Sequence, residues 1–239
     1  MTQTTQRLDK LLCHAKGLSR SEVKKGLHQG WAEVNGVVSK KGDIKVRSTD
    51  LVLWQGVRVE PLGSQYLMLN KPVGYEVTRV SQHHATVFDL LAELPSLDRI
   101  QPVGRLDVET SGLLFLTDDG QWAHRLMSPR HHQPKVYLAE LAEPLVEGAE
   151  QRLAEGLWLK HEKEKTRPAS LERLSPTRIR LTVTEGRYHQ VRRMLAALNN
   201  RVLSLHREAI GGLVLDETQL PAGSWRSLSA DEVADLGSA

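Results

Sequence analysis

Apolar spacing in the first 60 residues predicts two helices. The earlier helix is indicated by positions that recur with a helical period, Leu8, Leu11, Leu12 and Ala15. The later helix is predicted from Ser19 to near Gly30, with Ser19 as N-cap and Glu22 completing a capping box. A short pair of helices therefore opens the chain.

Two hairpins are predicted after these helices. Alternating residues surround Asn35-Gly36, a strong signal for a tight turn, and a further strand pair flanks Gln55-Gly56. Residues 60–64 then carry the proline and glycine typical of a linker. We therefore expect a domain boundary after residue 61, with domains at 1–61 and 62–239.

The larger part of the chain mixes strands with helices. Buried or alternating strands are predicted at 66–70, 113–117, 135–141 and 178–184. One short helix is expected through Trp122 and Met127, and another has its apolar stripe at Val191, Met194 and Leu198. This pattern favours an α+β fold with a mixed, mainly antiparallel sheet flanked by helices. Because no glycine-rich phosphate loop or dinucleotide fingerprint occurs, we expect no nucleotide cofactor.

Charge is distributed unevenly between the two parts. The whole chain has a formal net charge of +3, but residues 1–61 contain 11 Lys/Arg and 6 Asp/Glu, whereas the rest contains 21 and 23. A basic module joined to a near-neutral one suggests a polyanion-binding domain. Its candidate phosphate contacts are Arg20, Lys24, Lys25, Lys40 and Lys41. The alternative is a merely solvated surface.

Composition also narrows the expected compartment. Cys13 is the single cysteine and cannot form an internal disulfide, so a reducing cytoplasm is expected. The apolar runs fall short of the ~20 residues of a membrane span, and the polar start is unlike a signal peptide. We expect a cytoplasmic protein without a membrane partner, and a monomer.

The stretch from Gly104 to Leu114 carries the most informative carboxylate. Asp107 lies between Leu106 and Val108, beside Arg105 and just before an apolar run. Burial raises the pKa of a carboxylate and a neighbouring guanidinium lowers it, which is the environment of a nucleophile or general base. The alternative is an aspartate that caps the following Thr-Ser turn.

A second stretch, from Glu185 to Met194, carries two arginines beside a core-facing helix stripe. Arg192 and Arg193 are either a solvated helix edge or partners for a buried carboxylate, for which Asp107 is the obvious candidate. Tyr137 on its own is an ordinary strand aromatic.

The histidines do not predict a metal centre. His124, His131, His132 and His189 fit no standard ligand spacing. We expect no metal. His131 and His132 beside Arg130 are more typical of a loop that contacts nucleic acid.

Several motifs occur in order along the larger part. They are Asn70-Lys71-Pro72-x-Gly74-Tyr75, Gly104-Arg105-Leu106-Asp107, Lys135-x-Tyr137, the run from Glu185 to Met194, and Leu205-His206-Arg207. Together they closely resemble bacterial pseudouridine synthases of the ribosomal small-subunit type A family. The N-terminal part, with Arg7-Leu-Asp-Lys-Leu-Leu and the Val-Asn-Gly hairpin, resembles the small RNA-binding domain named after small-subunit ribosomal protein four.

The resemblance implies isomerisation of a uridine to pseudouridine in ribosomal RNA, without a cofactor. It implies 16S ribosomal RNA, or a small-subunit assembly intermediate, as partner and uridine 516 as target. Asp107 would be the nucleophile on a flipped-out uridine, and Tyr137 would stack on the uracil. Arg192 would pair with Asp107, and Arg193 would bind substrate or serve as the alternative partner of Asp107.

The same resemblance implies residues that hold the RNA. Arg105 would fill the space left by the flipped base or hold a phosphate, and Leu205 would pack under the base. Further RNA contacts are expected from Arg187 and His189, together with the Arg130 loop.

Three alternative functions are compatible with the same residues. One is a large-subunit (23S) pseudouridine synthase of the same family, and another is a non-catalytic RNA-binding ribosome-assembly factor. A third is a hydrolase that uses Asp107 and Glu109 as a carboxylate pair, since the two would share a face if they lay on a strand.

Overall fold

The computed structural model describes residues 5–47, 49–59, 63–94, 97–128 and 133–238, and the chain divides into two compact units, residues 1–64 and 65–239. The sequence-based boundary after residue 61 lies within residues 60–62, which are outside the described residues. Each unit has its own hydrophobic core.

Unit 1 packs two helices against short strands. Its described elements are β1 (Thr5–Arg7), α1 (Leu8–Lys16), α2 (Arg20–His28), β2 (Ala32–Val34), β3 (Val37–Val38), β4 (Lys45–Arg47), β5 (Val52–Trp54) and β6 (Val57–Arg58). The capping box at Ser19 and Glu22 is present, and the hairpin turns place Asn35 and Gln55 at positive φ. The β1–β4 pair, which places Lys45 and Arg47 on a strand, was not predicted from the sequence.

Unit 2 is built on one large sheet. Its described strands are β7 (Tyr66–Lys71), β8 (Tyr75–Glu76), β9 (Ala85–Thr86), β10 (Gln101–Val103), β11 (Thr110–Thr117), β12 (Lys135–Leu141), β13 (Ser170–Arg173), β14 (Arg178–Val183), β15 (Val202–Ile210), β16 (Leu213–Val214) and β17 (Trp225–Ser227). Its helices are α3 (Gly120–Met127), α4 (Ala149–Ala154), α5 (Gln190–Ala197) and α6 (Ala230–Ser238), with short 3-10 helices at Asp89–Leu91 and Leu97–Arg99.

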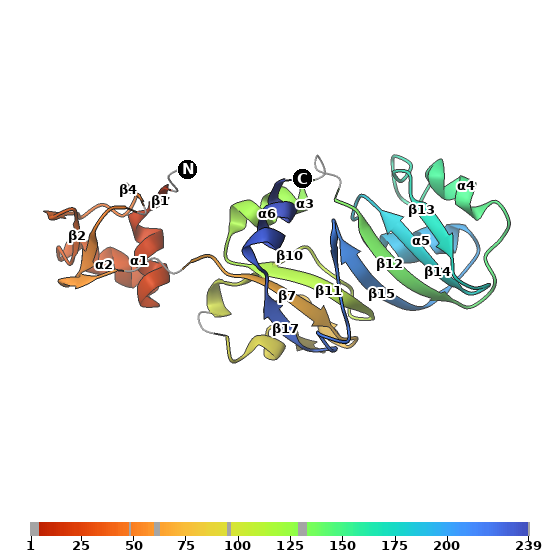
Figure 1. The fold of residues 1–239 in the computed structure, drawn as a ribbon, viewed down its shortest axis with the longest axis horizontal. Coiled ribbons are helices and arrows are strands. Elements are labelled where there is room, and N and C mark those ends of the chain that lie inside the picture. Colours follow the sequence, from red (N-terminus) through yellow and green to blue (C-terminus); the bar gives the residue numbers. More distant parts are fainter. Residues whose placement is uncertain (1–4, 48, 60–62, 95–96, 129–132, 239) are drawn as a thin grey trace. The chain divides into compact units, whose positions relative to one another are not determined.

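The sheet order in the described part is β13-β14-β12-β15-β11-β7-β17, with β10 beside β11 and β16 beside β15. Every adjacent pair in this sheet is antiparallel except β11 and β15, which are parallel. The expected α+β fold with a mixed, mainly antiparallel sheet is confirmed (Figure 1).

The parallel β11–β15 contact is unusually close at one glycine. Gly112 has a φ of 106°, and a Cβ atom there would overlap the backbone carbonyl and amide of Arg207. Glycine is therefore required where these two strands meet. This approach brings the start of β11, and the turn before it, next to the start of β15.

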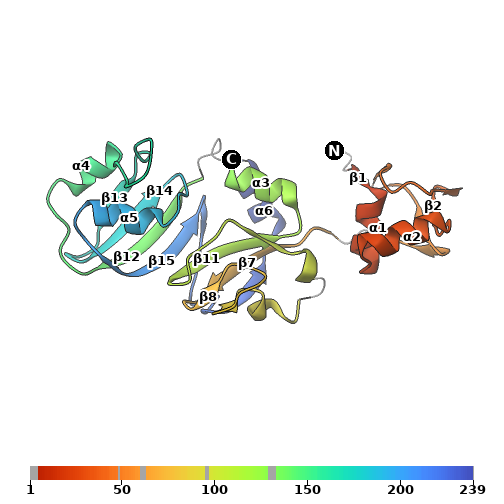
Figure 2. The ribbon, with the colours of Figure 1, turned by 180° about the vertical axis from the view of Figure 1, so that it is seen from behind.

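The two faces of the sheet are covered differently. On one face Leu113 and Phe115 of β11 pack with Trp122 of α3 and Leu236 of α6. On the opposite face Leu114 and Leu116 pack under the segment from Val77 to Leu106, and α5 covers β12 and β14 (Figure 2). Since side chains alternate along a strand, Lys71 lies on the same face as Leu67 and Leu69. This second face carries the motif residues.

Candidate functional site

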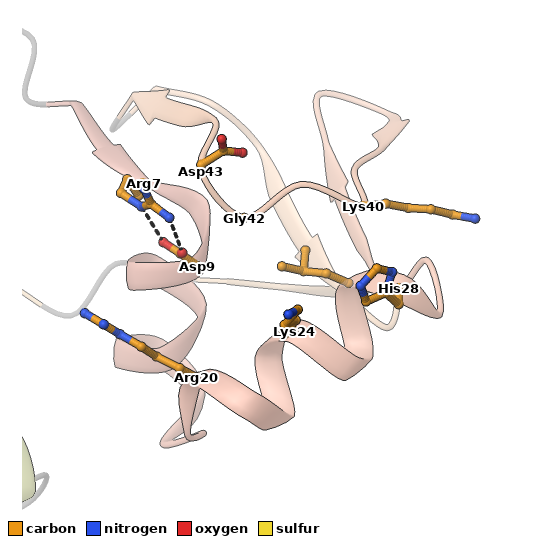
Figure 3. A pocket seen from close by; sticks show the side chains of 9 residues that line it. Arg7, Asp9, Arg20, Lys24, His28, Lys40, Gly42 and Asp43 are labelled. Carbon is orange, nitrogen blue, oxygen red and sulfur yellow. Dashed lines mark hydrogen bonds and ion pairs between the residues drawn. The ribbon is translucent and has the colours of Figure 1, made fainter.

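The described part of unit 1 contains a cationic cleft of about 460 Å³ (Figure 3). Arg20 and Lys24 of α2 line it together with Lys40. Arg7 also lines it, but its guanidinium is paired with Asp9 at 2.6 Å. The predicted contacts Arg20, Lys24 and Lys40 thus meet in one cleft, whereas Lys25 and Lys41 are exposed but do not line it. The arrangement suits an anionic ligand.

Asp107 lies in unit 2, in the turn that leads into β11. Its backbone carbonyl accepts a hydrogen bond from the Thr110 amide at 3.0 Å, which closes the turn. Its carboxylate is 35% exposed, and Oδ1 lies 3.4 Å from Nε2 of His189. Within the described residues the carboxylate caps no turn amide, so the capping alternative does not describe this side chain. The carboxylate is accessible to a bound molecule.

Lys71 places a buried cation beside this turn. Its ammonium group is fully buried and donates hydrogen bonds to the carbonyls of Pro72 at 2.9 Å, Val108 at 3.4 Å and Thr110 at 2.8 Å. Burial lowers the pKa of Lys71 to about 8, the charge of Asp107 raises it, and the charge of Arg207 lowers it. Lys71 therefore ties β7 to the turn that carries Asp107 and contributes positive potential there.

Arg207 is a second buried cation on this face. Its Nε donates to the carbonyl of Leu113 at 2.8 Å, and Nη1 donates to the Tyr137 hydroxyl at 3.4 Å. Its Nη2 is buried and has no hydrogen-bond partner among the residues that the structure describes. Tyr137 is half-buried and packs against the cluster that contains Leu106, the neighbour of Asp107. Tyr137 therefore packs near the turn that carries Asp107.

The expected ion pair between Arg192 and Asp107 is not formed. The Nη2 of Arg192 donates to the backbone carbonyl of Glu109 at 3.2 Å, and Nη1 donates to that of Val202 at 3.3 Å. The Arg192 guanidinium also lies 3.8 Å from the Glu109 carboxylate. This prediction was wrong because the guanidinium binds the carbonyls of Glu109 and Val202, and the side chain found near the Asp107 carboxylate is that of His189.

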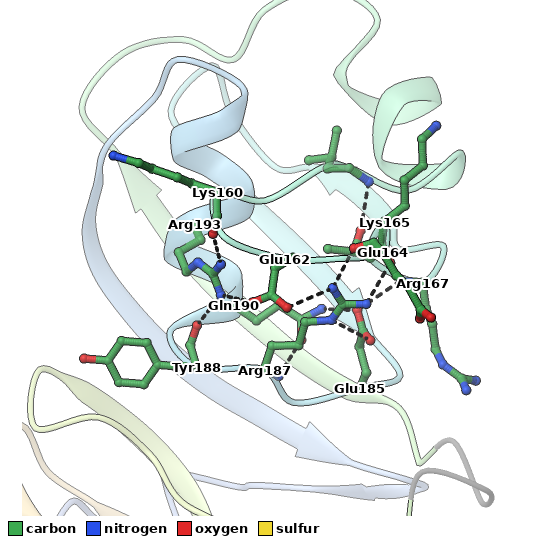
Figure 4. A network of polar contacts seen from close by, with 12 residues as sticks. Lys160, Glu162, Glu164, Lys165, Arg167, Glu185, Arg187, Tyr188, Gln190 and Arg193 are labelled. Atoms are coloured by element: carbon green, nitrogen blue, oxygen red, sulfur yellow. Dashed lines mark hydrogen bonds and ion pairs between the residues drawn. The ribbon is translucent and has the colours of Figure 1, made fainter.

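Arg193 is not the partner of Asp107 either. Its guanidinium binds the Glu162 carboxylate at 2.7 Å and the carbonyls of Lys160 and Tyr188 (Figure 4). The substrate-binding role expected for Arg193 is corrected, because its Nη1 and Nη2 already donate hydrogen bonds within the protein.

The guanidinium of Arg187 is also occupied by hydrogen bonds within the protein. It binds the Glu185 carboxylate at 3.1 Å and the carbonyls of Glu164 at 2.9 Å and Lys165 at 2.7 Å. The expected RNA contact of Arg187 is corrected for the same reason.

The remaining predicted site residues differ in exposure, and some of them lie outside the described residues. Arg105 is exposed and makes no hydrogen bond or ion pair with a described residue. Leu205 is buried and lines, with Val108 and Arg192, a cleft of about 740 Å³ at the start of β11 and β15. The predicted loop residues Arg130, His131 and His132 lie outside the described residues.

The alternative that Asp107 and Glu109 act as the carboxylate pair of a hydrolase is not supported by the structure. Asp107 to Glu109 lie in a turn and not on a strand, so the shared-face argument does not apply. The Glu109 carboxylate is 81% exposed and lies near Arg192.

Lys71 and Arg207 occur in the sequence motifs, but no role was predicted for either of them. Side chains alternate along a strand, so Lys71 is expected on the buried face that Leu67 and Leu69 occupy. By the same alternation, Arg207 is expected on the face of Leu205 and Ala209. Among the residues that the structure describes, no three His, Cys, Asp or Glu side chains group as metal ligands. No helix within these ranges is long and apolar enough to cross a membrane.

Comparison with known proteins shows close relatives over nearly the full chain. The chain is 44% identical to "Ribosomal small subunit pseudouridine synthase A" of Yersinia pestis, covering 97% of this chain and 98% of the relative. It is 46% identical to the protein of the same name from Pasteurella multocida, covering 95% and 98%. A solved structure described as a pseudouridylate synthase matches with a TM-score of 0.70 and 42% identity, over 96% of this chain and 99% of that one.

The sequence profile of the RNA pseudouridylate synthase family matches residues 65–197. This range includes the Asp107 turn, Tyr137 and the Arg192 helix, which are the motif residues grouped on one face of unit 2. The chain is therefore a member of the RNA pseudouridylate synthase family, an isomerase of the group that its bacterial relatives represent.

Proposed function

We propose that this protein converts a specific uridine of 16S ribosomal RNA to pseudouridine, at position 516. Support comes from full-length relatives named ribosomal small subunit pseudouridine synthase A. The observation that carries the proposal is the accessible Asp107 carboxylate, on a face that also holds the buried cations Lys71 and Arg207, the second of which donates to the Tyr137 hydroxyl. The substrate is naked 16S RNA or a small-subunit assembly intermediate.

The reaction breaks the bond between C1′ and N1 of uridine and joins C1′ to C5 after the uracil rotates. The C5 proton is lost and N1 gains a proton, so no electrons are exchanged and no group leaves. A carboxylate at Asp107 serves attack on C1′, addition to the uracil ring, or a glycal route. In each route the uridine must first leave the RNA stack, which costs a few kcal/mol.

Each remaining residue has a proposed task in this scheme. Tyr137 stacks on the flipped uracil and assists removal of the ring proton. Leu205 packs under the base, and Arg105 occupies the space left in the RNA or binds a phosphate. Arg192 keeps the turn in place by holding the Glu109 carbonyl against β15, which is a positioning role.

Mapping pseudouridine tests the proposal directly. In ribosomal RNA from cells that lack this protein, we expect one 16S pseudouridine to disappear, and purified protein should restore it on the extracted RNA. A loss in 23S RNA instead would move the target to the large subunit. Unchanged modification of both RNAs would contradict the enzymatic role and favour a non-catalytic assembly factor.

For unit 1 we propose RNA binding through the cleft of Figure 3, as in the ribosomal-protein-four type of domain. Replacing Arg20, Lys24 and Lys40 by Gln together should weaken RNA binding. It should also reduce the slope of log affinity against log salt by about 2, since each phosphate contact contributes about 0.7–0.9. Filter binding at several salt concentrations measures this slope. Exchanging Lys and Arg at these positions keeps the charge and should keep the slope; equal slopes for the Gln variant and wild type would contradict the proposal.

A further inference from the structure

The arginine network of unit 2 joins two segments that are distant in sequence (Figure 4). Arg193 on α5 binds the Glu162 carboxylate at 2.7 Å, the Lys160 carbonyl at 2.7 Å and the Tyr188 carbonyl at 3.1 Å. Arg187 binds the Glu164 and Lys165 carbonyls at 2.9 and 2.7 Å. The network therefore fixes the backbone of the loop at 158–167 against the turn before α5.

Tyr188 is held by its backbone in this network, yet its side chain is 72% exposed. The tyrosine ring stacks on His189, with centroids 3.9 Å apart and an interplanar angle of 15°. His189 in turn lies 3.4 Å from Asp107 through Nε2. An exposed aromatic ring is thus fixed two side chains away from the proposed nucleophile, and Figure 4 shows it extending away from the network.

Three lysines lie in the neighbouring loop, with Glu162 and Glu164 between them, and Figure 4 shows Lys160 extending on the side of Tyr188 and Lys165 on the other side of the network. Lys160, Lys163 and Lys165 are exposed, and their ammonium groups make no hydrogen bond or ion pair with a described residue. The backbone carbonyls of Lys160 and Lys165 are the ones bound by Arg193 and Arg187. The partly buried arginines thus hold the loop, while the lysine ammonium groups have no partner among the described residues and can bind an external anion.

We propose that Tyr188 and these three lysines form a flanking-strand surface for the RNA beside the target uridine. Tyr188 stacks on the base next to that uridine, and Lys160, Lys163 and Lys165 bind phosphates of the same strand. An aromatic ring beside unpaired cations is the combination that binds single-stranded RNA. The inference rests on the proposed action of Asp107 on a flipped uridine, since this makes the adjoining strand single-stranded locally.

Stacking is tested by combining substitutions of Tyr188 in the full-length protein with removal of single bases from the RNA, as in a double-mutant cycle. The probe is the 16S RNA fragment around the uridine found by mapping, with an abasic nucleotide at either neighbour of that uridine. Dissociation constants are measured in the Asp107→Asn background, where the RNA is not converted. Tyr188→Ala should weaken binding of the intact fragment by about 5- to 100-fold, while Tyr188→Phe stays within about twofold because the ring is kept.

The abasic neighbour that contacts Tyr188 should weaken binding to the parent by a similar factor and have little further effect on Tyr188→Ala. The stacking assignment would be overturned if, for both neighbouring positions, the loss of affinity from the abasic nucleotide multiplied with the loss from Tyr188→Ala. It would also be overturned if the Tyr188→Ala variant bound the intact fragment like the parent. With Asp107 restored, Tyr188→Ala should raise KM and leave kcat within about threefold. A wild-type protein inactive on every RNA would instead reject the proposed function.

The lysines are tested by salt dependence with the same intact fragment. Replacing Lys160, Lys163 and Lys165 by Gln together should lower the salt slope by about 2, as expected for three single-strand phosphate contacts. The Lys→Arg triple variant should keep the slope, and so should Tyr188→Ala because stacking releases no counterions. An unchanged slope in the Gln variant would overturn the phosphate-binding part of the surface.

Discussion

Asp107→Asn is expected to lower pseudouridine formation by at least about 10⁴-fold, the size of effect seen when a covalent nucleophile is removed. The substitution keeps the shape of the side chain but removes the negative charge and the nucleophilic oxygen pair. The carboxylate is 35% exposed and its one contact among the described residues is with His189, so folding should be little affected. Release of tritium from 5-tritiated uridine in RNA measures the rate.

Glu109→Gln is the matched control, because it removes the same charge two residues away. The Glu109 side chain is 81% exposed, and its one ion-pair partner in the described part of the chain is the Arg192 guanidinium at 3.8 Å, so activity should fall by less than about fivefold. The RNA dissociation constant of Asp107→Asn should stay close to that of wild type. An active Asn variant, or equal losses for both variants, would remove Asp107 from the nucleophile position.

Lys71→Met is expected to destabilise unit 2 by about 2–4 kcal/mol at pH 7. The methionine fills the buried space but leaves the carbonyls of Pro72, Val108 and Thr110 without their donor. Relief of the buried charge offsets part of this loss. For a unit of this size the melting temperature should fall by about 5–15 °C, measured by calorimetry. A melting temperature equal to that of wild type would contradict the structural role of Lys71.

The pH dependence of stability gives an independent test of the same residue. The pKa of Lys71 is lowered to about 8 in the folded protein from an ordinary value of 10.5, first through burial. Between these two values the unfolded chain binds more protons than the folded one, so stability rises with pH. Below pH 8 the lysine is charged in both the folded and the unfolded protein, and burying its charge then costs about 3 kcal/mol of folding stability.

The Met variant lacks this rise, so the stability difference between wild type and variant should widen by about 3 kcal/mol from pH 7.5 to pH 10.5. Urea unfolding at a series of pH values measures the difference. Lys135, whose pKa burial also lowers, contributes equally to both proteins and cancels in the comparison. A constant difference over this range would show that the folded-state pKa of Lys71 is not lowered.

Secondary structure was largely predictable because its signals are local. The capping box at Ser19 and Glu22 and the turn at Asn35-Gly36 depend on residues fewer than five positions apart. Strand alternation predicted β12 and β14, and helical spacing predicted α5. The parallel pairing of β11 with β15 was not predicted, since their paired residues are about 95 positions apart and only the close approach at Gly112 reveals it.

The candidate site shows the same division. By itself the sequence determined the motif residues, including Asp107 in its aliphatic setting, and the strand that carries Tyr137. It could not determine ionic partners, because a helical period places Arg192 on a face but says nothing of the distance across a groove. Only the tertiary structure decided that Arg192 holds strand-end carbonyls, that Arg187 and Arg193 brace a loop, and that Lys71 and His189 approach Asp107. The physical reason is that propensity acts over one turn or one strand, whereas charge pairing depends on which distant segments the folded core brings within a few ångströms.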